Sequence, residues 1–166
     1  MKKFELTAEF VTNVFGKKLF RIKALVAFGD VETGELGGFI EKEDNLSHYG
    51  NAWVYGDAQV YGNAWVSGDA QVSGNARVSG NAWVSGNADF AVVTGFGRYS
   101  RATTFFCCKD KILRVQCGCF YGDLAQFRKI VKKTHGNNKY AKEYLAIADL
   151  MELHFSGEKE KQEATE

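Results

Sequence analysis

The chain has 166 residues, and its 21 lysine and arginine residues nearly balance 20 aspartate and glutamate residues. Apolar residues make up 45% and charged residues 25% of the sequence, a composition typical of a folded soluble protein rather than a disordered one. No run of about 18 apolar residues is present, so the sequence predicts no membrane-spanning helix. The first residues lack the apolar core of a signal peptide, and we expect a cytoplasmic protein without a membrane partner.

The first 35 residues contain two runs in which apolar and polar residues alternate, residues 4–14 and 18–26. Such alternation is typical of strands that bury one face. We therefore expect a short strand pair, or a strand and a helix, over residues 1–35. This segment is a candidate cap for the repeat that follows.

Residues 50–91 repeat a six-residue unit, Gly-Asn/Asp-Ala-x-Val/Phe-x, seven times without a gap. In each unit alanine and valine lie on one face of an extended stretch, and glycine followed by Asn or Asp supplies a corner. A looser version precedes it, with Ile40 and Leu46 six residues apart, and residues 47–49 add two residues before the register becomes regular. We predict a parallel β-helix over residues 36–100, with alanine and valine stacked inside.

The repeat resembles that of the hexapeptide-repeat proteins, whose fold is a left-handed parallel β-helix with triangular coils of three hexads. The wider sequence resembles a subset of that family, small proteins of phages and prophages that are sometimes labelled polymer-forming or cytoskeletal. This resemblance implies a bacterial host cell, and it brings no firmly known activity. It rests on residues 3–7, 19–22, 29–47, 117–120 and 134–136.

Coils of three hexads place outward residues that are 18 apart on the same wall. Outward aromatic side chains must then be covered or used. Three alternatives stay open: the flanking segments cover them, they form the seam of a homo-oligomer, or they recognise another macromolecule. The predicted walls carry Trp53, Gln71 and Asp89; Gln59 and Arg77; and Trp65 and Trp83. The aromatic candidates for partner binding are Tyr49, Trp53, Tyr55, Tyr61, Trp65 and Trp83.

The segment after the repeat predicts two strands and two helices. Residues 103–108 and 112–117 flank a turn centred on Asp110, which indicates a hairpin. Asp123 with Gln126 forms a capping-box pattern for the first helix. The second helix is expected from about residue 139 to 155, before a polar tail.

The fold class is therefore mainly β: a short left-handed parallel β-helix of hexapeptide repeats with an N-terminal cap and a C-terminal ββαα unit. The expected divisions are a cap (1–35), a β-helix (36–100), a ββαα unit (101–155) and a disordered tail (156–166).

The four cysteines, Cys107, Cys108, Cys117 and Cys119, raise the possibility of a zinc site. Adjacent Cys107 and Cys108 point to opposite faces of a strand, and the hairpin keeps them roughly 13 Å along the strand from Cys117. We interpret them as structural thiols in a reducing compartment. Zinc, with His135 or His154, and a reactive thiol remain the alternatives.

His48 is the histidine nearest the repeat, and it lies where the register breaks. Acyltransferases of the hexapeptide family use a histidine base, and its carbonic anhydrases use three zinc-binding histidines, a set that is missing here. We expect His48 to lie at the edge of the core or in a cap. No catalytic residue, cofactor or metal is predicted.

Positively charged residues also gather on one face of the first predicted helix. The alternatives for this face are ordinary solvation and a weak contact with nucleic acid or an acidic protein. These further candidates for partner binding are Arg128, Lys129, Lys132 and Lys133.

Three classes of function stay open. The favoured one is a non-enzymatic interaction protein that uses the rigid repeat as a scaffold and binds a host bacterial protein. The phage resemblance implies interference with a host process such as antiviral defence, including CRISPR effectors.

The second class is a self-assembling structural protein, which the expected caps disfavour. The third is an acyltransferase relative that uses His48, or a binder of a small ligand such as a nucleotide. A ligand binder would use clefts between subunits and residues such as Arg77, Arg98 or Arg101. In each case we expect a homo-oligomer of two or three chains.

Overall fold

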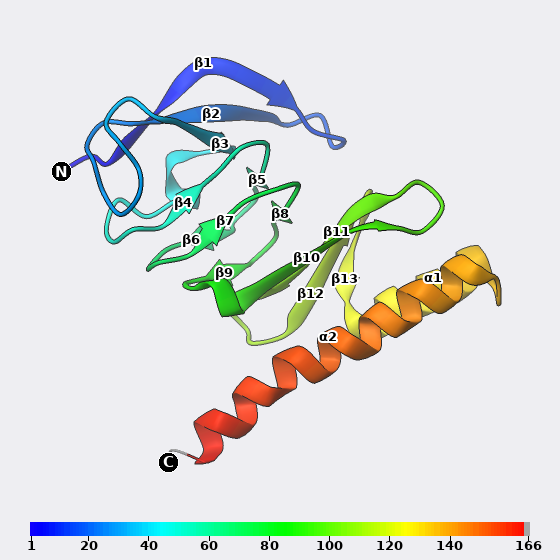
Figure 1. Ribbon diagram of the computed structural model, residues 1–166. Helices are drawn as coiled ribbons and strands as arrows, with labels where there is room; N and C mark the ends of the chain where they lie inside the picture. The colour runs from blue at the N-terminus through cyan, green and yellow to red at the C-terminus, as the bar shows by residue number, and fades with distance from the viewer. Residues whose placement is uncertain (165–166) are drawn as a thin grey trace.

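The structure, a computed structural model, describes the backbone of residues 1–164 and the side chains of residues 1–156 (Figure 1). N-terminal strands, a coil of very short strands, a second antiparallel sheet and two helices follow one another along the chain and in space. The expectation of a mainly β protein is confirmed.

The central coil is a β-solenoid built from six two-residue strands. Strands that are 18 residues apart pair in parallel, so that Trp53 pairs with Gln71, Gln59 with Arg77, and Trp65 with Trp83. These pairs confirm the walls expected from coils of three hexads, which the resemblance to hexapeptide-repeat proteins implied. The strands are β4 (Trp53–Val54), β5 (Gln59–Val60), β6 (Trp65–Val66), β7 (Gln71–Val72), β8 (Arg77–Val78) and β9 (Trp83–Val84).

The repeated alanines and valines fill the interior, because their side chains all point to one face of each extended stretch. From Ala52 to Val84, each is at most 1% exposed. The corner glycines adopt positive φ angles between 57° and 72°, a region that other residues enter only with strain. These glycines are Gly50, Gly56, Gly62, Gly68, Gly74 and Gly80.

The seventh copy of the repeat leaves the solenoid, contrary to the prediction. Gly86 has an extended backbone, residues Asn87–Asp89 form a short 3-10 helix, η2, and Ala88 is exposed. Asp89 therefore does not continue the wall. Instead the side chain of Asn87 accepts a hydrogen bond from the backbone N–H of Gln71, which ends that wall.

The N-terminal cap is a strand pair, the first of the two forms considered. Strands β1 (Phe4–Thr12) and β2 (Lys18–Ala24) form an antiparallel hairpin, and β2 also pairs with β3 (Leu36–Ile40). Strand β3 then pairs in parallel with β5, which joins the hairpin to the solenoid. Ile40 pairs with Val60 and Leu46 with Val66, at a spacing that accommodates the two extra residues of segment 47–49.

The C-terminal part has four strands rather than the two expected. The predicted hairpin is present as β11 (Arg101–Cys107) and β12 (Leu113–Cys117), and it is flanked by β10 (Phe90–Phe96) and β13 (Phe120–Asp123) in one antiparallel sheet. Strand β10 is not evident from the sequence because its first residues complete the last repeat. Strand β13 is not evident because it is short and contains Gly122.

Both predicted helices are present. Asp123 caps α1 (Leu124–His135) in a capping box with Gln126, as expected. Helix α2 spans Lys139–Ala164 and continues past Phe155, where the sequence predicted its end, and residues 165–166 lie outside the described residues. The glutamate, lysine, glutamine and alanine of this stretch have high helix propensity.

The sheet β10–β13 lies between the solenoid and the helices. Phe106 and Cys108 pack into the solenoid core. The alternate residues Phe105 and Cys107 of β11 face the helices, where the Phe105 ring packs against Phe127. The alternation of a strand therefore joins two separate cores. No helix of the described chain is long and apolar enough to cross a bilayer.

Candidate functional site

Two of the aromatic candidates are buried and belong to the core. Trp53 is 0% exposed, and its ring centre lies 5.2 Å from that of Phe28. A Cβ atom at Gly37 would approach the Trp53 ring to 2.8 Å, so this glycine allows β3 to lie against the indole. Tyr61 is 5% exposed and packs with Leu19. Their assignment to a partner surface was wrong.

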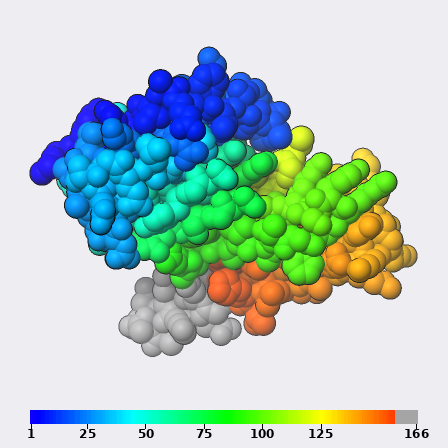
Figure 2. Space-filling model, turned by 45° about the horizontal axis from the view of Figure 1, so that its top comes forward, coloured from blue at the N-terminus to red at the C-terminus, as the bar shows by residue number. Residues whose placement is uncertain are grey.

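The N-terminal strands provide this cover, which is the first of the three alternatives for the outward aromatics. Figure 2 shows residues of the N-terminal segment, in dark blue, spread over the solenoid. Tyr55 is half-buried and packs against the solenoid core, whereas Tyr49 is exposed. The cover therefore does not extend to Tyr49.

Trp65 and Trp83 remain on the surface and form a pair. Their side chains are 40% and 46% exposed, and their ring centres lie 5.8 Å apart in an edge-to-face arrangement. The ammonium group of Lys109 lies 5.4 Å from the centre of the Trp83 ring. We call Trp65, Trp83 and Lys109 the tryptophan face. It is held by strands β6 and β9, whose valines are buried in the solenoid.

His48 lies at the N-terminal end of the solenoid, as expected for a residue of a cap. Its Nδ1 accepts a hydrogen bond from the backbone N–H of Lys3 at 3.1 Å, and its Nε2 lies 2.7 Å from Glu43. The ring stacks on Phe4, with 4.3 Å between centres. Both ring nitrogens are therefore engaged within the chain. The hydrogen bond from His48 lowers the pKa of the Glu43 carboxyl.

Lys3 completes this cap with a buried ammonium group. Its Nζ donates to the carbonyl oxygens of Ala52, at 2.7 Å, and Gly50, at 3.4 Å. It also lies 4.5 Å from the centre of the Phe28 ring. Burial lowers the pKa of Lys3 to about 8.

The cysteines separate as the strand geometry predicted. Cys108 packs in the solenoid core, Cys107 against the helix-facing core, and Cys119 is exposed. Cys117 lies opposite Thr103, and its sulfur accepts a hydrogen bond from that hydroxyl at 3.3 Å. Burial raises the pKa of the Cys108 thiol. Within the described residues, no group of three or more His, Cys, Asp or Glu side chains is placed to hold a metal ion.

The positive face of α1 is smaller than expected. Arg128 lies 2.9 Å from Asp149 and 3.0 Å from Glu152 of α2, so its charge is used between the two helices. The exposed remainder consists of Lys129, Lys132 and Lys133.

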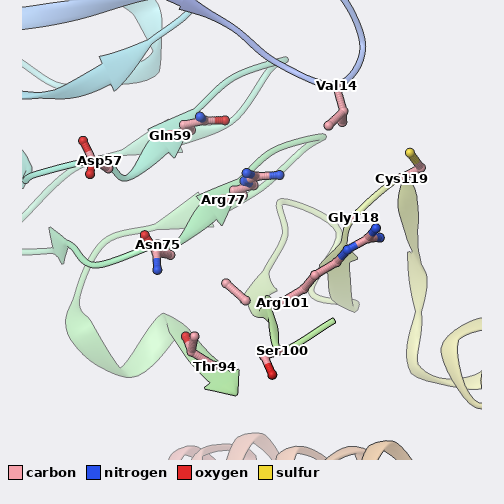
Figure 3. A pocket seen from close by; sticks show the side chains of 11 residues that line it. Val14, Asp57, Gln59, Asn75, Arg77, Thr94, Ser100, Arg101, Gly118 and Cys119 are labelled. Atoms are coloured by element: carbon pink, nitrogen blue, oxygen red, sulfur yellow. The ribbon is translucent and has the colours of Figure 1, made fainter. Parts of the chain in front are cut away.

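A cleft that the sequence analysis did not predict lies where the N-terminal hairpin, the solenoid and the C-terminal sheet meet (Figure 3). Its volume is about 520 Å³. Arg77 of the solenoid and Arg101 of β11 both line it, together with Gln59, Ser100 and Cys119. These residues come from distant parts of the chain, and only the arginines had been considered as ligand contacts, between subunits rather than within one.

Comparison with known proteins supports the repeat. Residues 58–71 and 70–86 match the family model described as YdcK beta solenoid repeat. The chain is therefore similar to that family over its central coils, which contain β5 to β9. No curated protein sequence matches the chain significantly.

Proposed function

We propose that this protein is a non-enzymatic interaction protein of phage type that binds a host bacterial protein through its tryptophan face. The observation that carries this proposal is the exposed pair of Trp65 and Trp83 on a wall fixed by the solenoid. Tryptophan is enriched among the few residues that dominate protein–protein binding energies. A rigid wall presents such side chains at a low cost in conformational entropy.

The surroundings of the pair indicate the chemistry of the partner. Lys109 lies over Trp83, and Lys42 bonds Asn63 at the corner next to Trp65, with 3.1 Å between Nζ and Oδ1. One ammonium group therefore lies against the exposed indole of Trp83, and a second is bonded to the corner residue two positions before Trp65. We infer a partner surface with an apolar pocket bordered by acidic side chains, since charge complementarity favours that pairing.

The scaffold that we infer is the left-handed hexapeptide β-helix, working in the cytoplasm of a bacterial host cell. The 18-residue pairing and the corner glycines with positive φ support this form of the solenoid. The resemblance to phage and prophage proteins favours a target in antiviral defence, such as a CRISPR effector, which the protein would inhibit by binding.

Self-assembly is the competing use of the same solenoid. End-to-end stacking requires open end coils, whereas β1–β3 and β10–β13 pack against the two ends.

A second copy of this chain, in a dimer or trimer, is the other possible occupant of the tryptophan face. Sedimentation velocity of the wild type and of a Trp65→Ser/Trp83→Ser variant separates these cases, because only a face-mediated oligomer dissociates in the variant.

The decisive experiment isolates bound proteins from nuclease-treated bacterial lysate with the wild type, the Trp65→Ser/Trp83→Ser variant and a Tyr49→Ser control. Tyr49 is 83% exposed but lies outside the tryptophan face. We expect one stoichiometric bacterial protein with the wild type and the control, and at least a tenfold loss with the double variant. The purified pair should form the same complex. Equal recovery of the bacterial protein with the double variant would overturn the proposal. A homo-oligomer whose interface is the tryptophan face would overturn it as well.

A further inference from the structure

The cleft between the solenoid and the C-terminal sheet concentrates positive charge at one end. Figure 3 shows the guanidinium groups of Arg77 and Arg101 toward the side of Cys119, with Asp57 and Asn75 at the opposite end. Neither arginine forms an ion pair within the described part of the chain, although Asp57 lines the same cleft. Paired arginines bind phosphate oxygens through several charge-assisted hydrogen bonds.

Besides the arginines and Asp57, several neutral polar groups line this cleft. The side-chain oxygen of Gln59 is buried and has no hydrogen-bond partner among the described residues. Thr94 and Ser100 add two hydroxyl groups. A buried acceptor without a hydrogen-bond partner lowers the stability of the folded protein. It therefore favours a ligand that carries a hydroxyl or N–H donor beside its anionic group.

A second, more apolar pocket of about 270 Å³ adjoins the cleft through Arg101 and Cys119, which line both. Aromatic rings of Tyr99, Phe120 and Tyr144 line this pocket. The Arg101 guanidinium lies 4.9 Å from the centre of the Tyr99 ring, so it stands at the junction of the two spaces. Together the volumes fall within the range of known small-molecule sites.

We propose that these two spaces form one binding site for a nucleoside phosphate. The phosphate would lie between Arg77 and Arg101, the ribose would lie beside Arg101 at the junction of the two spaces, and the base would enter the aromatic pocket beside Tyr99. Stacking on aromatic rings suits a base, because every base presents a π-face. This site is separate from the tryptophan face, and it stands whether or not a protein partner binds there.

The test measures binding of AMP and GMP to the full chain by calorimetry and by the shift in melting temperature. Adenosine, ribose 5-phosphate and inorganic phosphate serve as partial ligands. We expect at least one nucleotide to bind ten times more tightly than each of these. Absence of nucleotide binding would overturn the proposal, as would equal affinity for ribose 5-phosphate.

Variants locate the site. Arg77→Gln and Arg101→Gln should each weaken nucleotide binding at least tenfold, whereas Lys23→Gln removes an exposed charge from β2 and should leave it unchanged. Tyr99→Ser should weaken nucleotide binding but not that of ribose 5-phosphate. Melting temperatures without ligand should match the wild type, which distinguishes loss of contacts from unfolding. Nucleotide affinity that survives both arginine changes would place any binding elsewhere and overturn the assignment.

Discussion

The two ends of the solenoid are closed by different segments. At the N-terminal end the hairpin covers Trp53, whose ring packs against Phe4. At the C-terminal end the sheet inserts Phe106 into the core, and Thr104 accepts a hydrogen bond from the backbone N–H of Arg77 at 2.9 Å. Trp83 has the same place in the repeat as Trp53 but is 46% exposed. The repeat therefore determines which wall a side chain joins, and the flanking segments determine whether it is core or surface.

Truncating the two tryptophans is the strongest test of this difference. Trp53→Ala should lower the free energy of unfolding by about 3–5 kcal/mol, because it leaves a cavity under the hairpin. Trp83→Ala should cost about 1 kcal/mol or less, since its ring is half exposed and loses mainly the contact with Trp65. Urea denaturation of the two variants and the wild type measures both effects.

Equal destabilisation by the two changes would contradict this account, because it would mean that the hairpin does not bury Trp53. Trp53→Phe refines the measurement. The indole Nε1 is buried without a hydrogen-bond partner among the described residues, so losing it removes an unsatisfied donor as well as volume. We expect this variant to lie between the wild type and Trp53→Ala in stability.

A smaller effect tests the closure at the C-terminal end. Thr104→Val keeps the shape of the side chain but leaves the backbone N–H of Arg77 without its acceptor, which should cost about 1–3 kcal/mol. Thr103→Val is the matched control on the same strand, where the hydroxyl only donates to the sulfur of Cys117. Its cost should be below about 1 kcal/mol. Urea denaturation again measures the pair, and equal costs would show that the Thr104 hydroxyl does not close the solenoid edge.

The sequence predicts the solenoid well because its period is a local property. Pairing of Trp65 with Trp83 follows from counting residues once the resemblance has supplied coils of three six-residue units. The Asp123 cap of α1 follows from residues three apart. Burial of Trp53 does not follow in this way. It depends on Phe4 and Phe28, which belong to another segment and reach the indole only after folding.

The limits of the repeat were harder to predict for a related reason. Phe90 fits the repeat pattern but begins β10, because the neighbour that pairs with it, Phe106, lies outside the repeat. The cleft could not be predicted from the sequence because Gln59, Arg77 and Arg101 come from separate elements. No one of these residues indicates a binding site by its place in the sequence. Only the packing of the sheet against the solenoid brings them together.

The buried ammonium group at the N-terminal end makes the stability of the protein depend on pH. Burial lowers the pKa of Lys3 from its ordinary 10.5 to about 8 in the folded protein. Between these values the unfolded chain binds more protons at Lys3 than the folded one, so this residue makes stability rise with pH over that interval. In Lys3→Met this contribution is absent. The free energy of unfolding of the wild type relative to the variant should therefore increase from about pH 8 toward pH 10.5. Identical pH profiles would mean that the ammonium group is solvated, and that the hairpin does not seal the first coil at Ala52 and Gly50.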